Sequence, residues 1–151
     1  MHITNMPKID IKEEDFSSAD NAPLRVATIA AKGRGVFATT AIRAGDLIEE
    51  APSWGFTMEE AEIINKTGAF AYYFVRNDRD IAHEKFKGHF VFGLISIVNH
   101  SSNPNAKICW RDRDTGAWAS IVAIKDIQAG EEITHRYTNI HDYSDAAKFV
   151  D

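Results

Sequence analysis

The sequence predicts a mainly β domain of the α+β class, and three observations indicate it. Short apolar segments rich in β-branched and aromatic residues recur along the chain, with turn residues between them. One stretch alone has the capping and apolar spacing of a helix. The 151 residues are enough for one compact domain with a substantial core, and too few for two.

The first strands are expected to begin at Leu24. Residues 1–22 before it are polar and irregular, and we interpret them as a flexible N-terminal arm. The segment LRVATIAA alternates well enough for a strand, Gly33-Arg34-Gly35 interrupts it, and VFATTAI resumes in an extended style. A turn at Ala44-Gly45 then leads to a short strand that ends before Pro52.

The best helical stretch is 57–75, because Thr57 and Glu60 have the spacing of a capping box. The following run HFVFGLISIVNH is apolar, rich in β-branched and aromatic residues and short, so we expect a buried strand. AKICWRD and AWASIVAI flank Asp114-Thr115-Gly116, which indicates a hairpin. A second Ala-Gly turn at Ala129-Gly130 leads to the last short strand.

Composition and charge exclude several classes of function. Lys and Arg number 17 against 22 Asp and Glu, and the resulting charge of −5 argues against a nucleic-acid binder and suits a basic peptide partner. Cys109 is the only cysteine, so neither an intramolecular disulfide nor a cysteine zinc cluster is expected. We expect no metal, because the histidines that could act as ligands lack the spacing of a zinc site. These histidines are His83, His89, His135 and His141.

Targeting and membrane signals are not evident in the sequence. Residues 1–20 lack the basic and apolar regions of a signal peptide, and no apolar run approaches the roughly 20 residues that span a bilayer. We therefore expect an intracellular protein, cytoplasmic if bacterial, that is not secreted and does not contact membranes.

Taken one at a time, the candidate motifs fit structural roles as well as functional ones. Gly33-Arg34-Gly35 lacks the third glycine of a dinucleotide site, so a tight turn explains it, although glycines also let a ligand approach the backbone. Asn99-His100 ends an apolar run, where asparagine supports turns as readily as it binds ammonium or carboxylate groups. Tyr72, Tyr73 and Phe74 are typical of core packing.

The order of these motifs along the chain is more informative than any one of them. KGRGVFATTAIRAGDLI, AYYF, NHSSNPN and AGEEITHRY together closely resemble the signature series of the SET domain, the family of S-adenosylmethionine (AdoMet)-dependent protein lysine methyltransferases. The resemblance runs from about Leu24 to Tyr137. It does not include the flanking domains of larger eukaryotic members, so the chain is similar to the compact SET proteins of bacteria and viruses. It implies a SET domain over 23–151, with a core of about 24–138 and a short tail, 139–151.

The resemblance implies a fold of small curved β-sheets with short helices. In this fold the C-terminal segment is threaded, as in a pseudoknot, under the loop that holds the Asn-His motif, an exception to the usual avoidance of threaded loops. Asn99 and His100 would then leave a buried strand at the crossing point, and Ser101–Asn105 would form the turn that holds the threaded segment.

The resemblance also implies a cofactor site. Asn99 would bind the amino group of AdoMet or nearby main chain, and His100 would meet the adenine mostly through its backbone. Tyr137 matches the catalytic tyrosine beside the sulfonium and the target nitrogen. The residues implied to bind the cofactor are Lys32, Gly33, Arg34, Gly35, Asn99, His100 and Tyr137.

A substrate channel is implied beside the cofactor. Tyr72, in the Y-x-F pattern, matches a channel tyrosine with a catalytic role, although the register between Tyr72 and Tyr73 stays open. The channel residues implied are Tyr72, Tyr73, His135 and Tyr143. The attacking lysine must be neutral, but the pKa of a free lysine side chain is about 10.4, so it is mostly an ammonium at neutral pH. An aromatic channel that ends at a sulfonium disfavours this charged form by desolvation and by like-charge repulsion. S-adenosylhomocysteine would be the product, and no metal is required.

Several positions depart from the family pattern. His135 stands where many members carry a Phe or Tyr that affects how many methyl groups are added, and Thr138 replaces a common glycine. Ser96 stands near a common arginine. No cysteine-rich zinc segment follows the core, so the channel must be closed by other groups: Tyr143, Phe149 or a second copy in a homodimer.

The sequence therefore predicts an AdoMet-dependent lysine N-methyltransferase that acts on a protein, such as a histone or another basic protein. Two alternatives stay open. A free amine metabolite could be the substrate, because the chain has no obvious peptide-docking extension. A non-catalytic SET-like binding module would explain the departures at His135 and Thr138, although the retention of Tyr137 argues against it.

Overall fold

The computed structural model describes residues 23–137, so the expected arm (1–22) and tail (139–151), together with Thr138, lie outside the described residues. Its strands are β1 (Leu24–Ile29), β2 (Gly33–Ala38), β3 (Leu47–Phe56), β4 (Tyr73–Phe74), β5 (Gly88–Val91), β6 (Asn99–His100), β7 (Ala106–Arg113), β8 (Gly116–Ala123) and β9 (Thr134–His135). Its helices are α1 (Met58–Ile64) and the 3-10 helices η3 (Gly68–Tyr72), η4 (Ile81–His83) and η5 (Leu94–Ile97).

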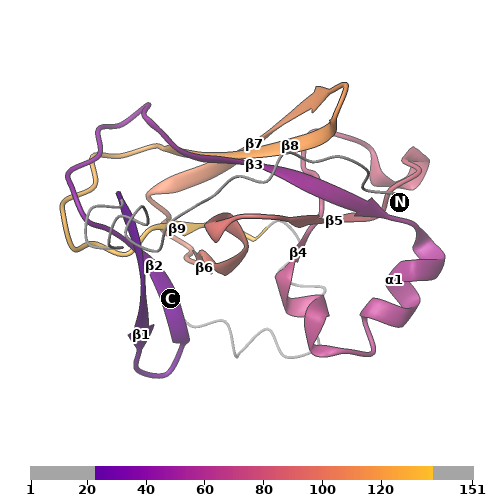
Figure 1. The fold of residues 1–151 in the computed structure, drawn as a ribbon, viewed down its shortest axis with the longest axis horizontal. Helices are drawn as coiled ribbons and strands as arrows, with labels where there is room; N and C mark the ends of the chain where they lie inside the picture. Colours follow the sequence, from indigo (N-terminus) through magenta and orange to yellow (C-terminus); the bar gives the residue numbers. More distant parts are fainter. Residues whose placement is uncertain (1–22, 138–151) are drawn as a thin grey trace, which may run out of the picture.

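The strands form three small sheets, which confirms the prediction of a mainly β fold with short helices. An antiparallel five-stranded sheet has the order β4-β5-β3-β8-β7, β1 pairs with β2 antiparallel, and β6 pairs with β9 in parallel. The β1–β2 hairpin lies at one end of the large sheet and α1 at the other (Figure 1). No helix in the described range 23–137 is long and apolar enough to cross a bilayer.

The predicted helix over 57–75 is only partly correct. The capping box is present, since Thr57 Oγ1 accepts from the Glu60 N–H (3.4 Å) and Glu60 Oε1 accepts from the Thr57 N–H (3.0 Å). The α-helix ends at Ile64, and Thr67 Oγ1 caps a separate turn, η3, by accepting from the Ala69 N–H (3.2 Å). The chain then becomes strand β4, because pairing with β5 satisfies backbone groups that helix continuation would have used.

The apolar run HFVFGLISIVNH is not one strand, as the sequence indicated, but β5, the turn η5 and then β6. The run is interrupted at Gly93, and a carboxylate from β3 holds the turn that follows, because Glu49 Oε1 accepts from the Ile95 N–H (2.9 Å) at the start of η5. The predicted hairpin is confirmed as β7–β8, in which Arg113 pairs with Gly116.

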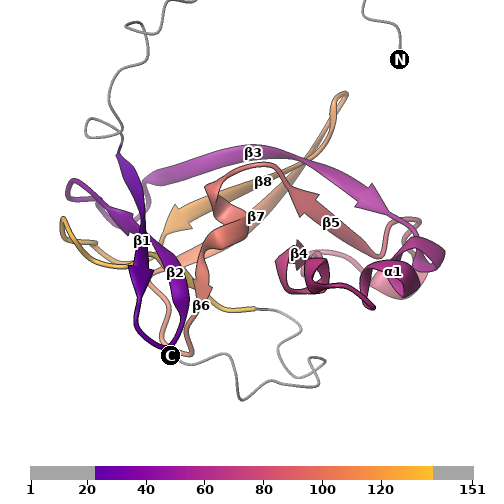
Figure 2. The same cartoon turned by 60° about the horizontal axis from the view of Figure 1, so that its bottom comes forward.

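The segment of residues 130–137, here called the threaded segment, is bonded on both sides. Towards β2, the Ile133 N–H donates to the Val36 oxygen (2.8 Å). Towards β6, it pairs through β9, and the Ser101 N–H donates to the His135 oxygen (3.0 Å). Figure 2 shows β6 beside β2. The segment therefore lies between β2 and the loop that follows the Asn-His motif, as the implied threaded fold requires.

Asn105 closes this loop over the threaded segment. Its Nδ2 donates to the Glu132 oxygen (2.8 Å), and its Oδ1 accepts from the Thr134 N–H (2.9 Å). The Asn105 N–H also donates to Thr134 Oγ1 (3.4 Å). The turn expected at Ser101–Asn105 thus holds the segment through the Asn105 side chain and through the backbone N–H groups at both of its ends.

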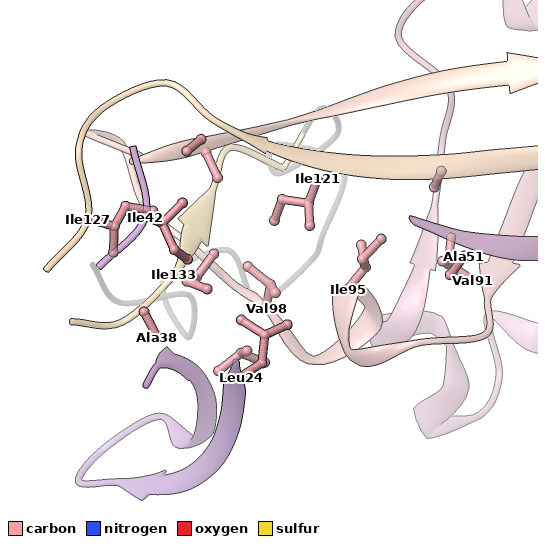
Figure 3. Close-up of a cluster of buried hydrophobic side chains, with 14 residues drawn as sticks. Leu24, Ala38, Ile42, Ala51, Val91, Ile95, Val98, Ile121, Ile127 and Ile133 are labelled. Carbon is pink, nitrogen blue, oxygen red and sulfur yellow. The ribbon is translucent and has the colours of Figure 1, made fainter. Parts of the chain in front are cut away.

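The hydrophobic core lies between the large sheet and the two smaller sheets (Figure 3). Val98 and Ile133 are buried in it, one residue before β6 and one before β9 respectively. Burial of such side chains contributes about 1.5–3 kcal/mol each. The core therefore fixes the points from which the polar residues of both motifs extend.

Candidate active site

Asn99 connects the first glycine-rich turn to the threaded segment. Its Nδ2 donates to the Arg34 backbone oxygen (2.9 Å) and to Glu132 Oε2 (2.9 Å). Both partners can only accept, so the amide nitrogen must face them and Oδ1 faces the opposite way. The arrangement leaves an acceptor oxygen at a defined position beside the backbone of residues 32–35, here called the glycine segment.

Gly35 is required by close packing rather than by an unusual backbone angle. A Cβ atom there would lie 2.5 Å from Glu132 Oε2 and 2.9 Å from Asn99 Nδ2. Gly33, by contrast, has a φ of +86° as the first residue of β2, directly after the turn at residues 30–32. The glycine stretch that was expected to interrupt the strand is therefore the paired start of β2, and it admits a polar cluster against its backbone.

Lys32 and Glu132 complete this cluster, since Lys32 Nζ lies 3.7 Å from Glu132 Oε1. The donor and acceptor set fits an amino acid zwitterion, because the Asn99 oxygen can accept from its ammonium group and Lys32 can donate to its carboxylate. It thus fits the methionine part of AdoMet. Glu132 was missed from the sequence, where a Glu-Glu pair after a turn is typical of a solvated face.

His100 is buried and holds the end of the threaded segment. Its Nδ1 accepts from the Tyr137 N–H (3.0 Å), and the two rings lie 5.3 Å apart. A neutral His100 ring therefore carries its proton on Nε2. The sequence reasoning gave His100 a backbone role towards adenine, which stays a prediction; its side chain positions Tyr137.

Tyr137 connects the Asn-His motif to a pocket. Its hydroxyl donates to the Val98 backbone oxygen (3.3 Å), directly before Asn99. Its ring also lines a pocket of about 380 Å³. The pocket is formed by Ala71, Tyr72, Tyr73, Phe74, Val75, Asn77, Ser96, Val98, Pro104, Ala106, Lys107, Ile108, Trp110, Ile124, His135, Arg136 and Tyr137.

Four of the residues expected in the substrate channel and catalytic site line this pocket: Tyr72, Tyr73, His135 and Tyr137. The fifth, Tyr143, lies outside the described residues, as does Phe149. The expected cofactor residues of the glycine segment do not line the pocket; the backbone oxygen of Arg34 bonds to Asn99 instead.

Tyr72 and Tyr73 both line the pocket, but their surroundings differ. The Tyr73 hydroxyl donates to Asn65 Oδ1 (3.0 Å), and its ring packs edge-on against Phe56 (5.0 Å), within an aromatic cluster beside α1. Tyr72 is 46% exposed at the pocket. Phe74 packs against the hydrophobic core, as interpreted from the sequence, and it also lines the pocket and stacks on His135 at 5.6 Å.

His135 is an uncharged, buried group in the pocket lining. It is 3% exposed, and its Nε2 has no hydrogen-bond partner among the described residues. Burial is the main cause that lowers its pKa to about 4; the nearby His100 adds to this, and a backbone hydrogen bond at Arg136 opposes it. At neutral pH the ring is therefore neutral, with a nitrogen that an occupant of the pocket can satisfy.

The charges around the pocket are cationic. Among the described residues, the lining contains Lys107 and Arg136 but no carboxylate. An apolar, aromatic lining with two cations disfavours an ammonium relative to a neutral amine. Residues 23–137 also contain no group of three His, Cys, Asp or Glu side chains placed to hold a metal ion.

Arg76 anchors the loop that forms one wall of the pocket, and the sequence gave no sign of it. It is buried, its Nη1 donates to Asp112 Oδ1 (2.7 Å), and its Nε donates to Asp78 Oδ1 (2.9 Å). The guanidinium also lies 5.4 Å from the centre of the Trp110 ring. Its hydrogen bonds lower the pKa of both carboxyl groups.

Comparisons with known proteins agree with this geometry. The SET domain model matches residues 33–138. A Schizosaccharomyces pombe protein named histone-lysine N-methyltransferase, H3 lysine-37 specific, is 30% identical over 116 residues, which cover 77% of this chain and 74% of the relative.

Two solved structures share the fold. A Plasmodium falciparum protein described as a histone methyltransferase has a TM-score of 0.61 at 22% identity, covering 78% of this chain and 94% of that one. The Neurospora SET domain protein DIM-5, described as a histone lysine methyltransferase, has a TM-score of 0.59 at 23% identity, covering 79% and 53% respectively.

Proposed function

Because the chain belongs to the SET domain family, a family of lysine N-methyltransferases, we propose that it transfers a methyl group from AdoMet to the ε-amine of a lysine in a protein. One observation carries the proposal. The Tyr137 backbone bonds to His100 and its hydroxyl bonds to Val98, the two neighbours of Asn99 in the chain, and its ring lines the aromatic pocket. A donor site and an acceptor site therefore meet at one hydroxyl-bearing ring.

AdoMet supplies an activated methyl group when it is bound, and S-adenosylhomocysteine is the product. Asn99, Lys32 and the backbone of the glycine segment would hold its amino acid part. Methyl transfer is an in-line displacement, so the protein's main task is to align the amine with the methyl carbon. The Tyr137 hydroxyl orients the amine, and the pocket lining favours the neutral amine that must attack.

The pocket also bears on the choice between a protein lysine and a free polyamine. A site for a cationic metabolite would be expected to present carboxylates, and the described lining has none. The composition of the pocket thus favours a lysine side chain that enters from a polypeptide. The Schizosaccharomyces pombe relative is named for histone H3, which makes histones the first proteins to test.

Mass spectrometry of a histone mixture incubated with AdoMet and the protein tests the proposal. We expect 14-Da increments on lysine, and Tyr137→Phe should lower the rate by about 10²-fold, as expected for loss of an aligned hydrogen-bond partner of the amine. Tyr73→Phe is the matched control, because the Tyr73 hydroxyl is bonded to Asn65 and not to the reacting groups.

Two results would reject the proposal. Methylation of a free amine in place of any protein lysine would support the metabolite alternative. Binding of AdoMet without transfer to either would make the chain a binding module. The homodimer and the intracellular location stay predictions; light scattering during gel filtration measures the first.

A further inference from the structure

Glu132 is the member of the polar cluster whose role the family resemblance leaves unassigned. Its carboxylate is 19% exposed and uses its two oxygens differently. Oε2 accepts from Asn99 Nδ2 at 2.9 Å, whereas Oε1 lies 3.7 Å from Lys32 Nζ. The close approach to the glycine segment depends on Gly35, where a Cβ atom would meet Oε2 at 2.5 Å.

The backbone on both sides of Glu132 is fixed independently of its side chain. The Glu132 oxygen accepts from Asn105 Nδ2 (2.8 Å), and the following residue, Ile133, bonds to Val36 and is buried. Glu132 also forms an antiparallel bridge with Phe37. The carboxylate is therefore presented to Asn99 from a rigid support, and it is not needed to form that support.

The carboxylate strengthens the preference of the Asn99 amide for one orientation. The Arg34 oxygen already favours the amide nitrogen over the amide oxygen, and Glu132 adds a second, charged acceptor on the same side. With two acceptors 2.9 Å from the same nitrogen, a flipped amide would bring its oxygen against the Arg34 oxygen and the Glu132 carboxylate. The flipped state is excluded by lone-pair repulsion, so Oδ1 is held on the opposite side.

We propose that Glu132 is a positioning residue for the methyl donor: it fixes the Asn99 carboxamide so that Oδ1 accepts a hydrogen bond from the donor's α-ammonium group. The inference rests on the proposed function. Lys32 balances the charge of the Glu132 carboxylate. The distance from Lys32 Nζ to Glu132 Oε1 is longer than a hydrogen bond, so Lys32 does not compete with Asn99 for the carboxylate. Loss of Glu132 should weaken binding of the α-ammonium in particular.

Calorimetry with two ligands distinguishes this role from a general structural one. The ligands are S-adenosylhomocysteine and its analogue without the α-amino group. Glu132→Ala should lower the affinity for the first about tenfold or more, consistent with loss of an aligned charged contact, and should change the affinity for the second less than threefold. Glu132→Gln should restore most of the loss, because its amide oxygen can still accept from Asn99.

The matched control is Glu131→Ala, which removes the same charge from the exposed neighbouring residue and should leave both affinities unchanged. Thermal unfolding by circular dichroism checks the fold of each variant. If Glu132→Ala does not fold, Glu132→Asp replaces it, since the shorter side chain keeps the charge and withdraws the oxygen from Asn99. The same selective loss is expected.

Equal losses for both ligands, or no loss for either, would overturn the inference while the proposed function stands. Failure of the wild-type protein to bind either ligand would overturn both. A selective loss for the ligand that carries the amino group, with recovery in Glu132→Gln, is the result that supports the positioning role.

Discussion

Replacing His135 by phenylalanine removes the unpartnered ring nitrogen of the pocket and leaves a ring of similar size to pack on Phe74. Burial lowers the pKa of His135 from 6.5 to about 4. The folded protein therefore resists protonation of this ring, whereas the unfolded chain takes up the proton below its ordinary pKa. The substitution separates this effect from all others that acidification has on the chain.

The sign and size of the effect follow from linkage. Above pH 6.5 the His135 ring is neutral in both the folded and the unfolded chain, so its lowered pKa does not change the free energy of unfolding. As the pH falls from 6.5 towards 4, only the unfolded chain takes up the proton, and the free energy of unfolding falls. One pKa unit corresponds to about 1.4 kcal/mol, so the wild-type protein should lose about 2 kcal/mol of unfolding free energy through this group between about pH 7.5 and pH 5.

Urea unfolding at several pH values measures this loss. Between about pH 7.5 and pH 5, the unfolding free energy of His135→Phe should fall by about 2 kcal/mol less than that of wild type. At pH 7.5 it should be at least as stable as wild type, because an unpartnered buried nitrogen costs about 1–3 kcal/mol. His83→Phe, at a side chain that is 84% exposed, is the control and should follow wild type. Identical acid profiles for His135→Phe and wild type would refute the assignment of a buried neutral ring.

Three further substitutions test how the site is supported. Asn105→Ala should lower the unfolding free energy by about 2 kcal/mol, because it removes two side-chain hydrogen bonds to the threaded segment. Asn103→Ala is its control in the same urea titrations. Arg76→Met should destabilise the protein at pH 7 by about 1–2 kcal/mol, a value reduced for the partial exposure of both carboxylates. This loss should shrink as the pH falls below 3.8, since the lowered pKa values of Asp78 and Asp112 make their contribution present above that pH. Tyr72→Phe should raise the KM for a lysine peptide several-fold with little change in stability; an unchanged KM would remove Tyr72 from the channel.

The parts of the fold and site that could be predicted are those written in local patterns. The capping box at Thr57 and the hairpin turn near Gly116 depend on neighbouring residues, and both are present. Asn99 and Tyr137 could be singled out because each belongs to a short motif, and the structure brings them together through β6 and β9.

The parts that could not be predicted depend on partners distant in the sequence. Glu49 bonds to the first turn of η5 from 46 residues away, so the only local sign of the interruption in HFVFGLISIVNH was Gly93. Arg76 lies in a polar stretch typical of a solvated loop, and Asp112, 36 residues later, makes it a buried anchor. Glu132 looked like one of two exposed acids until the fold placed it against Asn99.

The pairing of donor site and pocket at Tyr137 is tested most directly by a bisubstrate ligand. Such a ligand joins the adenosine and amino acid parts of AdoMet, through nitrogen in place of the sulfonium, to a four-carbon amine chain that matches a lysine side chain. If the two sites meet at Tyr137, calorimetry should find this ligand bound at least tenfold more tightly than S-adenosylhomocysteine, with the gain reduced in Trp110→Ala at the pocket wall. An affinity no greater than that of S-adenosylhomocysteine would show that the pocket does not open onto the donor site.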